Sequence, residues 1–307
     1  MNTRKMIAVC LTLVAALGLP LTVLAQEYDL ANGSVEVTAR DDGQYVTQTN
    51  GVSNEKQTTP TVIKQTGGST KNTITIKAGE NQTAEVTLSG VNIDTSNSSG
   101  AAVTTEGKGN VTIELDGSNT VKSGENHAGV EKNNEGNLTI ADQNKDGSLN
   151  ATGGYNGAGI GGGRQGDGSN ITVSGGEVTA TGGAGGAGIG GGIFGSGTNI
   201  TVSDGEVTAT GGKYGAGIGG GATGAGTDIT VSGGEVTATG GEHCAGIGGG
   251  GKGAGTNIIV SNDAQGKVPR KWDEDFKAFD EVVKQSGQGL KKYRGKAVEK
   301  WTAACPA

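Results

Sequence analysis

The stretch that decides the fold is residues 170–198, NITVSGGEVTATGGAGGAGIGGGIFGSGT, which is one copy of a 29-residue unit. The block GAGIGGG starts at Gly157, Gly186 and Gly215, and a fourth copy reads CAGIGGG from Cys244. The isoleucine at the centre of this block recurs at Ile160, Ile189, Ile218 and Ile247. A fixed period of this length is typical of a solenoid, in which each unit buries its apolar face against its neighbours.

Each unit contains three short runs in which apolar and polar residues alternate: ITVS, EVTAT and GAGIG. Alternation with a period of two is typical of strands with one buried face. Three strands in 29 residues predict one turn of a right-handed parallel β-helix, an all-β fold, with equivalent apolar residues stacked from coil to coil. The residues before the ITVS strand form a column for which we expect a structural role at the coil corner: Asn170, Asn199, Asp228 and Asn257.

Weaker copies of the unit extend the pattern toward the N-terminus. We expect the β-helix to span residues 73–266 in about six or seven coils. Residues 26–72 are predicted to form strands that close its N-terminal end. In residues 267–307 apolar residues such as Trp272, Phe276 and Trp301 recur at helical spacing, which predicts a helical tail that covers the last coil. A protein-docking role is the alternative for this tail.

Residues 1–25 have the features of a secretory signal peptide. A basic start at Arg4 and Lys5 is followed by an apolar run, and Val23-Leu24-Ala25 is a typical cleavage site. No later apolar run is long enough to span a membrane. These features predict a secreted protein, and association with the cell surface is compatible with them.

Charge and cysteine content narrow the function classes further. The chain has a net charge of −7, while residues 267–307 hold ten basic and six acidic residues (+4), so residues 1–266 carry −11. An acidic body argues against nucleic acid as a partner. Cys244 and Cys305 remain after signal removal, and either a disulfide or two thiols is compatible with the sequence.

One stretch matches the first half of an EF-hand calcium loop. It contains Asp142, Asn144 and Asp146, followed by Gly147. The twelfth position is Gly153, so the usual bidentate glutamate is missing. Calcium is therefore the one cofactor that the sequence suggests, and a solvated loop is the alternative.

The EVTAT strands are expected to place a regular set of polar side chains on one outward face. This set is Glu177, Thr179, Thr181, Glu206, Thr208, Thr210, Glu235, Thr237 and Thr239. A two-threonine array resembles the surface of ice-binding solenoids, although the glutamate stripe interrupts its flatness. Tyr155 and Tyr214 are expected on the adjoining turns, where aromatic rings can stack on sugars.

An enzyme is the less favoured function. Parallel β-helices include polysaccharide lyases, which place acidic calcium ligands beside a basic residue. The regular repeats contain one arginine, Arg164, and one histidine, His243, and show no such cluster.

Residues 50–263 carry a resemblance to a known group of proteins. The segments GVNID (90–94), GNVTIELDGSNTVKSG (109–124), HAGVEKNNEGNLTI (127–140) and GSLNATGG (147–154), followed by the GAGIGGG and NITVSGGEVTATGG blocks, carry it. The chain resembles secreted bacterial surface proteins rich in GAGIGGG repeats, often labelled carbohydrate-binding-domain proteins. The resemblance implies a β-helical surface domain involved in glycan binding or adhesion. Longer relatives continue into further domains and wall anchors, whereas this chain departs from them after Asn262.

Together these features predict a secreted, non-enzymatic β-helix that binds extracellular glycan or a cell surface through the EVTAT face, Tyr155 and Tyr214. The alternatives are a passive stalk or spacer and a polysaccharide lyase. The sequence does not set the oligomeric state.

Overall fold

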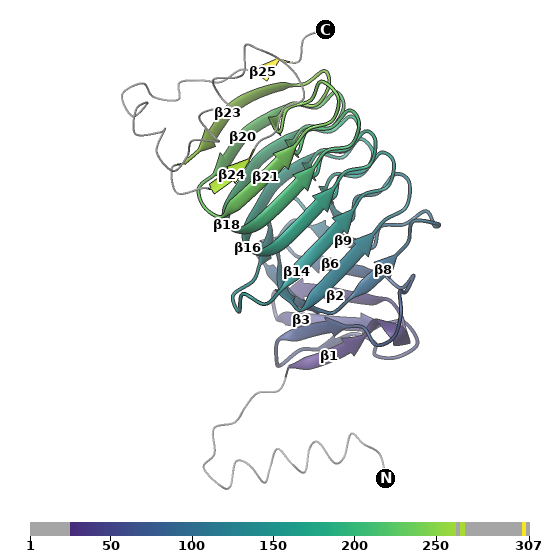
Figure 1. Cartoon of the computed structure of the whole chain (residues 1–307). Coiled ribbons are helices and arrows are strands. Elements are labelled where there is room, and N and C mark those ends of the chain that lie inside the picture. The colour runs from purple at the N-terminus through teal and green to yellow at the C-terminus, as the bar shows by residue number, and fades with distance from the viewer. Residues whose placement is uncertain (1–24, 262–264, 268–302, 305–307) are drawn as a thin grey trace, which may run out of the picture.

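The computed structural model describes residues 25–261, 265–267 and 303–304. They form an all-β parallel solenoid of about seven turns, whose coils stack along one axis from the purple N-terminal end to the green C-terminal end (Figure 1). The predicted fold class is thereby confirmed. Most of the predicted signal peptide and most of the predicted helical tail lie outside the described residues. Cys305 does too, and with it any Cys244–Cys305 disulfide.

Three faces make up each regular coil. The first face contains the ITVS strands and belongs to a 15-stranded sheet in which neighbours pair in parallel, apart from β25. Its strands are β1 (Gln26–Asp29), β5 (Thr61–Lys64), β7 (Thr83–Ser89), β10 (Asn110–Asp116), β13 (Leu138–Ala141), β16 (Gly168–Thr181), β18 (Gly197–Thr210), β20 (Gly226–Val231), β23 (Ala254–Val260) and β25 (Ala303–Ala304).

The second face contains the EVTAT strands and belongs to the same sheet. The two faces are continuous because β16 and β18, each 14 residues long, include both an ITVS and an EVTAT run. The remaining strands of the second face are β8 (Asn92–Asp94), β11 (Ser118–Lys122), β14 (Ser148–Thr152), β21 (Glu235–Thr239) and β24 (Gln265–Lys267).

The third face contains the GAGIG strands and forms the 10-stranded sheet. Its parallel strands are β2 (Val35–Arg40), β6 (Ile74–Ala78), β9 (Val103–Gly107), β12 (Val130–Lys132), β15 (Ile160–Gly161), β17 (Ile189–Gly190), β19 (Ile218–Gly219) and β22 (Ile247–Gly248). In the regular coils these strands are only two residues long, because the glycines that follow the isoleucine turn the chain at once.

The N-terminal region closes the stack with antiparallel strands. β3 (Gly43–Gln48) pairs with β2, and β4 (Glu55–Lys56) pairs with β3, so both lie at the edge of the third face. A short 3-10 turn, η1 (Leu30–Asn32), connects β1 to β2. Parallel pairing begins earlier than the predicted boundary at residue 73, since β1 pairs with β5 and β2 with β6. The reason is that VEVTA in β2 already alternates like a coil strand.

The core is a set of stacked apolar columns along the solenoid axis. In the third face Ile160 pairs with Ile189, Ile189 with Ile218, and Ile218 with Ile247. The first three are 0% exposed and the last is 4% exposed. Burying one isoleucine side chain contributes about 1.5–3 kcal/mol, so the columns supply a thin but continuous hydrophobic core.

Close backbone contact at the corners explains the high glycine content. A Cβ atom on Gly212 would lie 1.6 Å from the carbonyl oxygen of Gly183, the equivalent residue one coil earlier. Stacked turns therefore touch through their backbones, which leaves no room for a side chain between coils.

Candidate functional site

The second face brings together the polar residues that the sequence predicted. The parallel register places Glu177 beside Glu206 and Glu206 beside Glu235, and it aligns the two threonine columns in the same way. The columns are Thr179, Thr208 and Thr237, and Thr181, Thr210 and Thr239. The glutamates are exposed and the threonines half-buried. We call this set of nine side chains the Thr-Glu face; its rows repeat at about 4.8 Å.

The threonine columns continue into an earlier, less regular coil. Asn150 pairs with Thr179 and Thr152 with Thr181, so the polar rows extend across β14. One coil earlier, Lys122 pairs with Thr152. The Thr-Glu face is thus the regular part of a longer polar surface.

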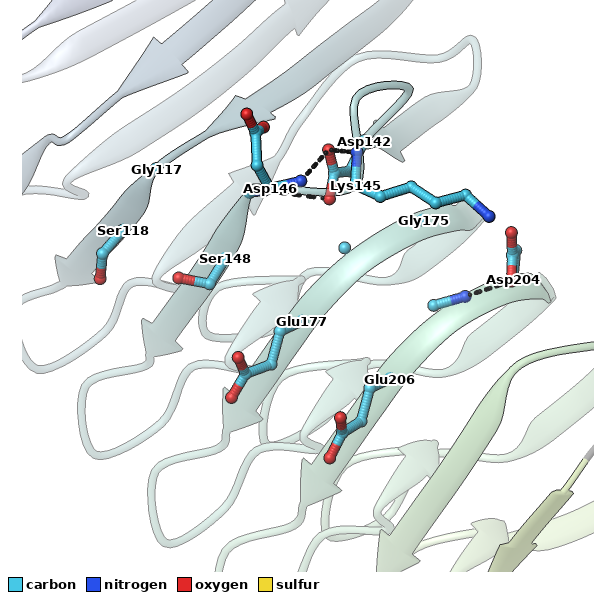
Figure 2. A pocket seen from close by; sticks show the side chains of 13 residues that line it. Gly117, Ser118, Asp142, Lys145, Asp146, Ser148, Gly175, Glu177, Asp204 and Glu206 are labelled. Carbon is cyan, nitrogen blue, oxygen red and sulfur yellow. Dashed lines mark hydrogen bonds between the residues drawn. The ribbon is translucent and has the colours of Figure 1, made fainter.

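An acidic groove lies at the start of the second face (Figure 2). It has a volume of about 480 Å³, and the loop of residues 142–147 borders it. Its charged lining residues are Asp142, Lys145, Asp146, Glu177, Asp204 and Glu206. Five carboxylates with a single lysine give the groove a negative charge. In the sequence the loop and the glutamate stripe are separate features, and only the stacking of the coils brings them together.

In the loop proposed for calcium, the side chain of Asp142 is hydrogen-bonded to the backbone of the loop itself. The Asp142 carboxylate accepts hydrogen bonds from the backbone N–H groups of Lys145 (2.8 Å), Asp146 (3.3 Å) and Gly147 (3.1 Å). Asn144 and Asp146 are exposed. Among the described residues, no group of three or more His, Cys, Asp or Glu side chains is placed to hold a metal ion. Calcium therefore stays a prediction, and the amide contacts explain Asp142 as a residue that shapes the loop.

Three large aromatic side chains are exposed on the described part of the chain: Tyr155 (61%), Phe194 (51%) and Tyr214 (44%). Tyr155 and Tyr214 lie on the turns that follow the second face, as predicted. They are two coils apart along the axis, or about 10 Å. Phe194 is a further candidate, on the loop after β17. Its exposure is the signal that distinguishes it from the buried apolar residues of the repeat. We call these three residues the aromatic edge.

Backbone hydrogen bonds join the turns that carry the aromatic edge. They run from Gly185 N to Tyr155 O (3.0 Å), from Tyr214 N to Ala184 O (2.9 Å), and from Ile193 N to Asn156 O (2.9 Å). Because each turn is bonded to the next, the aromatic side chains project from a rigid base.

A lysine adds a positive charge at the aromatic edge. Lys213 Nζ lies 5.2 Å from the centroid of the Tyr214 ring and 3.8 Å from Glu242 Oε2. The contact with Tyr214, and then the Glu242 carboxylate, raise the pKa of Lys213. Lys213 therefore keeps its charge at neutral pH, beside a ring that can stack on a ligand.

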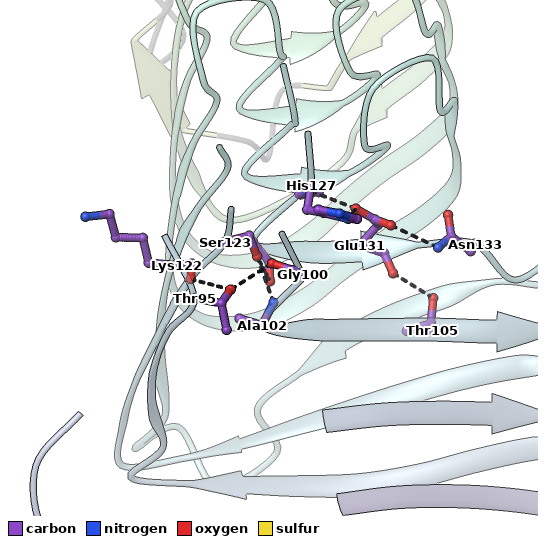
Figure 3. A network of polar contacts seen from close by, with 11 residues as sticks. Thr95, Gly100, Ala102, Thr105, Lys122, Ser123, His127, Glu131 and Asn133 are labelled. Carbon is purple, nitrogen blue, oxygen red and sulfur yellow. Dashed lines mark hydrogen bonds and ion pairs between the residues drawn. The ribbon is translucent and has the colours of Figure 1, made fainter. Parts of the chain in front are cut away.

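A buried polar network occupies the third face near β12 (Figure 3). Glu131 replaces the glycine of the regular repeats, since it pairs with Gly161, and it is 8% exposed. Its carboxylate contacts His127 Nδ1 (2.8 Å) and accepts hydrogen bonds from Ala128 N (3.0 Å) and Asn133 Nδ2 (3.1 Å). These partners satisfy both carboxylate oxygens, so the network stabilises this coil.

Comparison with known proteins supports the repeat architecture. The model of a family described as beta helix repeat matches residues 145–164, 171–193, 200–222 and 229–251. Comparison with curated proteins and with solved structures found no match. No helix among the described residues is long and apolar enough to cross a membrane. The four matched segments each span strands of successive faces in the parallel stack, so the similarity to beta helix repeats follows the coils of this solenoid.

Proposed function

We propose that this chain is a secreted, non-enzymatic protein that binds extracellular glycan, as a surface protein or adhesin does, through the Thr-Glu face and the aromatic edge. The single observation that carries the proposal is the aromatic edge. Tyr155 and Tyr214 stand on turns that directly follow strands of the polar, regular second face, and the loop that carries Phe194 is hydrogen-bonded to the turn of Tyr155. Export is expected from the signal features of residues 1–25.

The two surfaces supply complementary contacts for a sugar chain. Aromatic rings offer flat apolar faces for the C–H groups of a sugar ring, and tyrosine adds a hydroxyl at its edge. The threonine hydroxyls and the glutamate carboxylates can hydrogen-bond sugar hydroxyl groups. Their arrangement in rows about 4.8 Å apart favours a long, repetitive ligand over a small one.

A glycan array probed with purified residues 26–307 tests the proposal. We expect binding to a limited set of glycans. Tyr155→Ala/Tyr214→Ala should weaken that binding at least tenfold, because it removes two of the three rings. Thr181→Arg/Thr210→Arg should also weaken it by placing long side chains across the threonine rows. Ile259→Ala is the matched control, since Ile259 is 45% exposed but lies on the first face in β23.

The two alternative functions predict different results. A passive stalk binds no glycan on the array. A polysaccharide lyase releases unsaturated sugar products from acidic polysaccharides, which absorb ultraviolet light. Binding that Tyr155→Ala/Tyr214→Ala leaves unchanged would contradict the placement of the site at the aromatic edge.

A further inference from the structure

A second groove lies on the outward side of the first face, near the N-terminal end of the solenoid. It has a volume of about 540 Å³. One wall is the segment of residues 57–61, which leads into β5, and the floor is the outward side of β7 and β10. Gln143, in the loop after β13, borders it on the far side. We call it the N-terminal groove. It contains no residue of the Thr-Glu face or the aromatic edge.

The N-terminal groove gathers buried oxygen atoms without hydrogen-bond partners. Among the described residues, the buried side-chain atoms of this kind are Gln57 Oε1, Thr59 Oγ1 and Glu114 Oε2. All three residues line this one groove. A buried polar atom without a partner raises the free energy of the folded state, and a cluster of such atoms at one site points to a missing partner.

The surrounding hydrogen bonds explain why these particular oxygens have no hydrogen-bond partner. Gln57 Nε2 donates to Tyr28 Oη (2.7 Å) and to Glu55 O (2.8 Å), so the amide nitrogen is used and Oε1 remains. Glu114 Oε1 accepts a hydrogen bond from Gln143 N (2.5 Å), so Oε2 remains. Burial raises the pKa of Tyr28 to about 12, so its hydroxyl stays neutral well above physiological pH.

The charge of the groove selects the kind of partner. Glu85 and Glu114 line it, and no lysine, arginine or histidine does. The remaining oxygens accept hydrogen bonds, and only the Thr59 hydroxyl can also donate one. A ligand group that fits must therefore donate several hydrogen bonds and carry a positive charge. A primary ammonium group has three donors, no acceptor and one positive charge.

We propose that the N-terminal groove binds the primary ammonium group of an amino sugar. The ammonium group bonds Glu114 Oε2, its counter-charge, and hydroxyl groups of the sugar reach Gln57 Oε1 and Thr59 Oγ1 on the opposite wall. The sugar ring fills the rest of the groove beside the outward threonines Thr87 and Thr112. The volume suits a sugar unit better than a bare ion, since small-molecule sites typically span about 300–1,000 Å³. The oxygens are covered by their own walls, so binding includes a rotation of Thr59 and Glu114 about their side-chain bonds.

Isothermal titration calorimetry with two matched ligands tests this proposal. The probes are the hexamer of β-1,4-linked glucosamine and cellohexaose, which has a hydroxyl in place of each amine. We expect the glucosamine hexamer to bind residues 26–307 at least tenfold more tightly than cellohexaose. The preference should disappear at a pH at which the amines are uncharged. The preference for the glucosamine hexamer should persist in the Tyr155→Ala/Tyr214→Ala variant. The result of this titration is therefore independent of the glycan site proposed above.

Single substitutions test whether the glucosamine hexamer binds in the N-terminal groove. Glu114→Gln keeps the shape of the side chain and should weaken binding of the glucosamine hexamer at least tenfold. Glu135→Gln makes the same charge change at an exposed glutamate outside both grooves and the Thr-Glu face, and should leave binding of the glucosamine hexamer unchanged. Thr59→Val, in a segment outside the strands, is a second variant expected to weaken binding, and circular dichroism checks that each variant is folded.

Three results would overturn the proposal. Equal binding of cellohexaose would show that the amine is not recognised. Equal losses in Glu114→Gln and Glu135→Gln would indicate general attraction to an acidic protein. Binding of calcium chloride that prevents binding of the glucosamine hexamer would show that the groove is a metal site.

Discussion

At the scale of the residue, the asparagine column shows how the coil corners are held. Asn199 has a φ of 54°, in the left-handed region, and Asn170, Asp228 and Asn257 share this conformation. Most residues lose about 1–2 kcal/mol there, whereas asparagine tolerates it. Asn199 Nδ2 also donates to Asn170 Oδ1 (2.7 Å), so the column is bonded along the axis. The structural role that we predicted for this column is confirmed.

We expect Asn199→Ala to lower the free energy of unfolding by about 2 kcal/mol, because it removes the hydrogen bond and places an ordinary residue at positive φ. Asn199→Gly should lower it by only about 1 kcal/mol, since glycine accepts this conformation. Urea denaturation measures both. Thr201→Ala, an outward position in the same strand, is the control. Equal losses in the alanine and glycine variants would show that backbone conformation is not the cause.

At the scale of the element, β12 departs from the regular repeat. Lys132 pairs with Thr105, whose side chain is fully buried, and is itself only 6% exposed. Its Nζ donates to the backbone oxygen of Asn134 (2.6 Å). None of the ion pairs among the described residues includes Lys132, and burial lowers its pKa to about 8. β12 therefore contains a lysine that is costly to keep charged.

The lowered pKa predicts a pH-dependent stability. Below pH 8 the lysine is charged in both states, and the folded state bears the cost of burial. Between pH 8 and 10.5 the unfolded state binds more protons, so the free energy of unfolding rises with pH. A fall in pKa from 10.5 to about 8 corresponds to about 3 kcal/mol.

We therefore expect Lys132→Met to be more stable than the native chain at pH 7, and this gain to shrink as the pH approaches 10.5. Urea denaturation of both proteins at several pH values measures the difference, in which the titration of other groups cancels. Lys122→Met, at an exposed lysine, is the control. A gain that does not change with pH would mean that Lys132 binds its proton equally well in the folded and unfolded states.

At the scale of the whole molecule, each regular coil contacts mainly its neighbours. Equivalent strands pair residue for residue, as β18 does with β16 on one side and with β20 and β21 on the other. Stability in such a stack is close to a sum of coil and interface contributions. Removing one complete coil should therefore shorten the molecule without changing its fold.

Deleting residues 179–207, one 29-residue period, joins Val178 to Thr208 and keeps the alternation. We expect a folded protein whose unfolding has a smaller denaturant dependence, because less surface is exposed on unfolding. Deleting residues 179–206 joins Val178 to Val207 and turns the following threonines inward, which should destabilise the fold strongly. Circular dichroism and urea denaturation compare the two. Similar behaviour of both deletions would contradict the stacked register.

The sequence by itself determined the coil, its 29-residue period and the residues that stack. Identical units have identical neighbours, so the alternation around Ile160, Ile189 and Ile218 is enough to place each of them in the core. The same reasoning predicted the Thr-Glu face, since outward residues of equivalent strands must align.

Only the tertiary structure decided how residues without repeated equivalents meet. The loop of residues 142–147 joins Glu177 and Glu206 in one groove, Phe194 joins Tyr155 and Tyr214 at one edge, and residues 57–61 cover β7 and β10. Neither the loop of residues 142–147 nor residues 57–61 has a repeated equivalent that would place it, and Phe194 stands where the neighbouring coils have Gln165 and Thr223. The path of such a segment depends on how it packs against the neighbouring coil, and local periodicity carries no information about that packing.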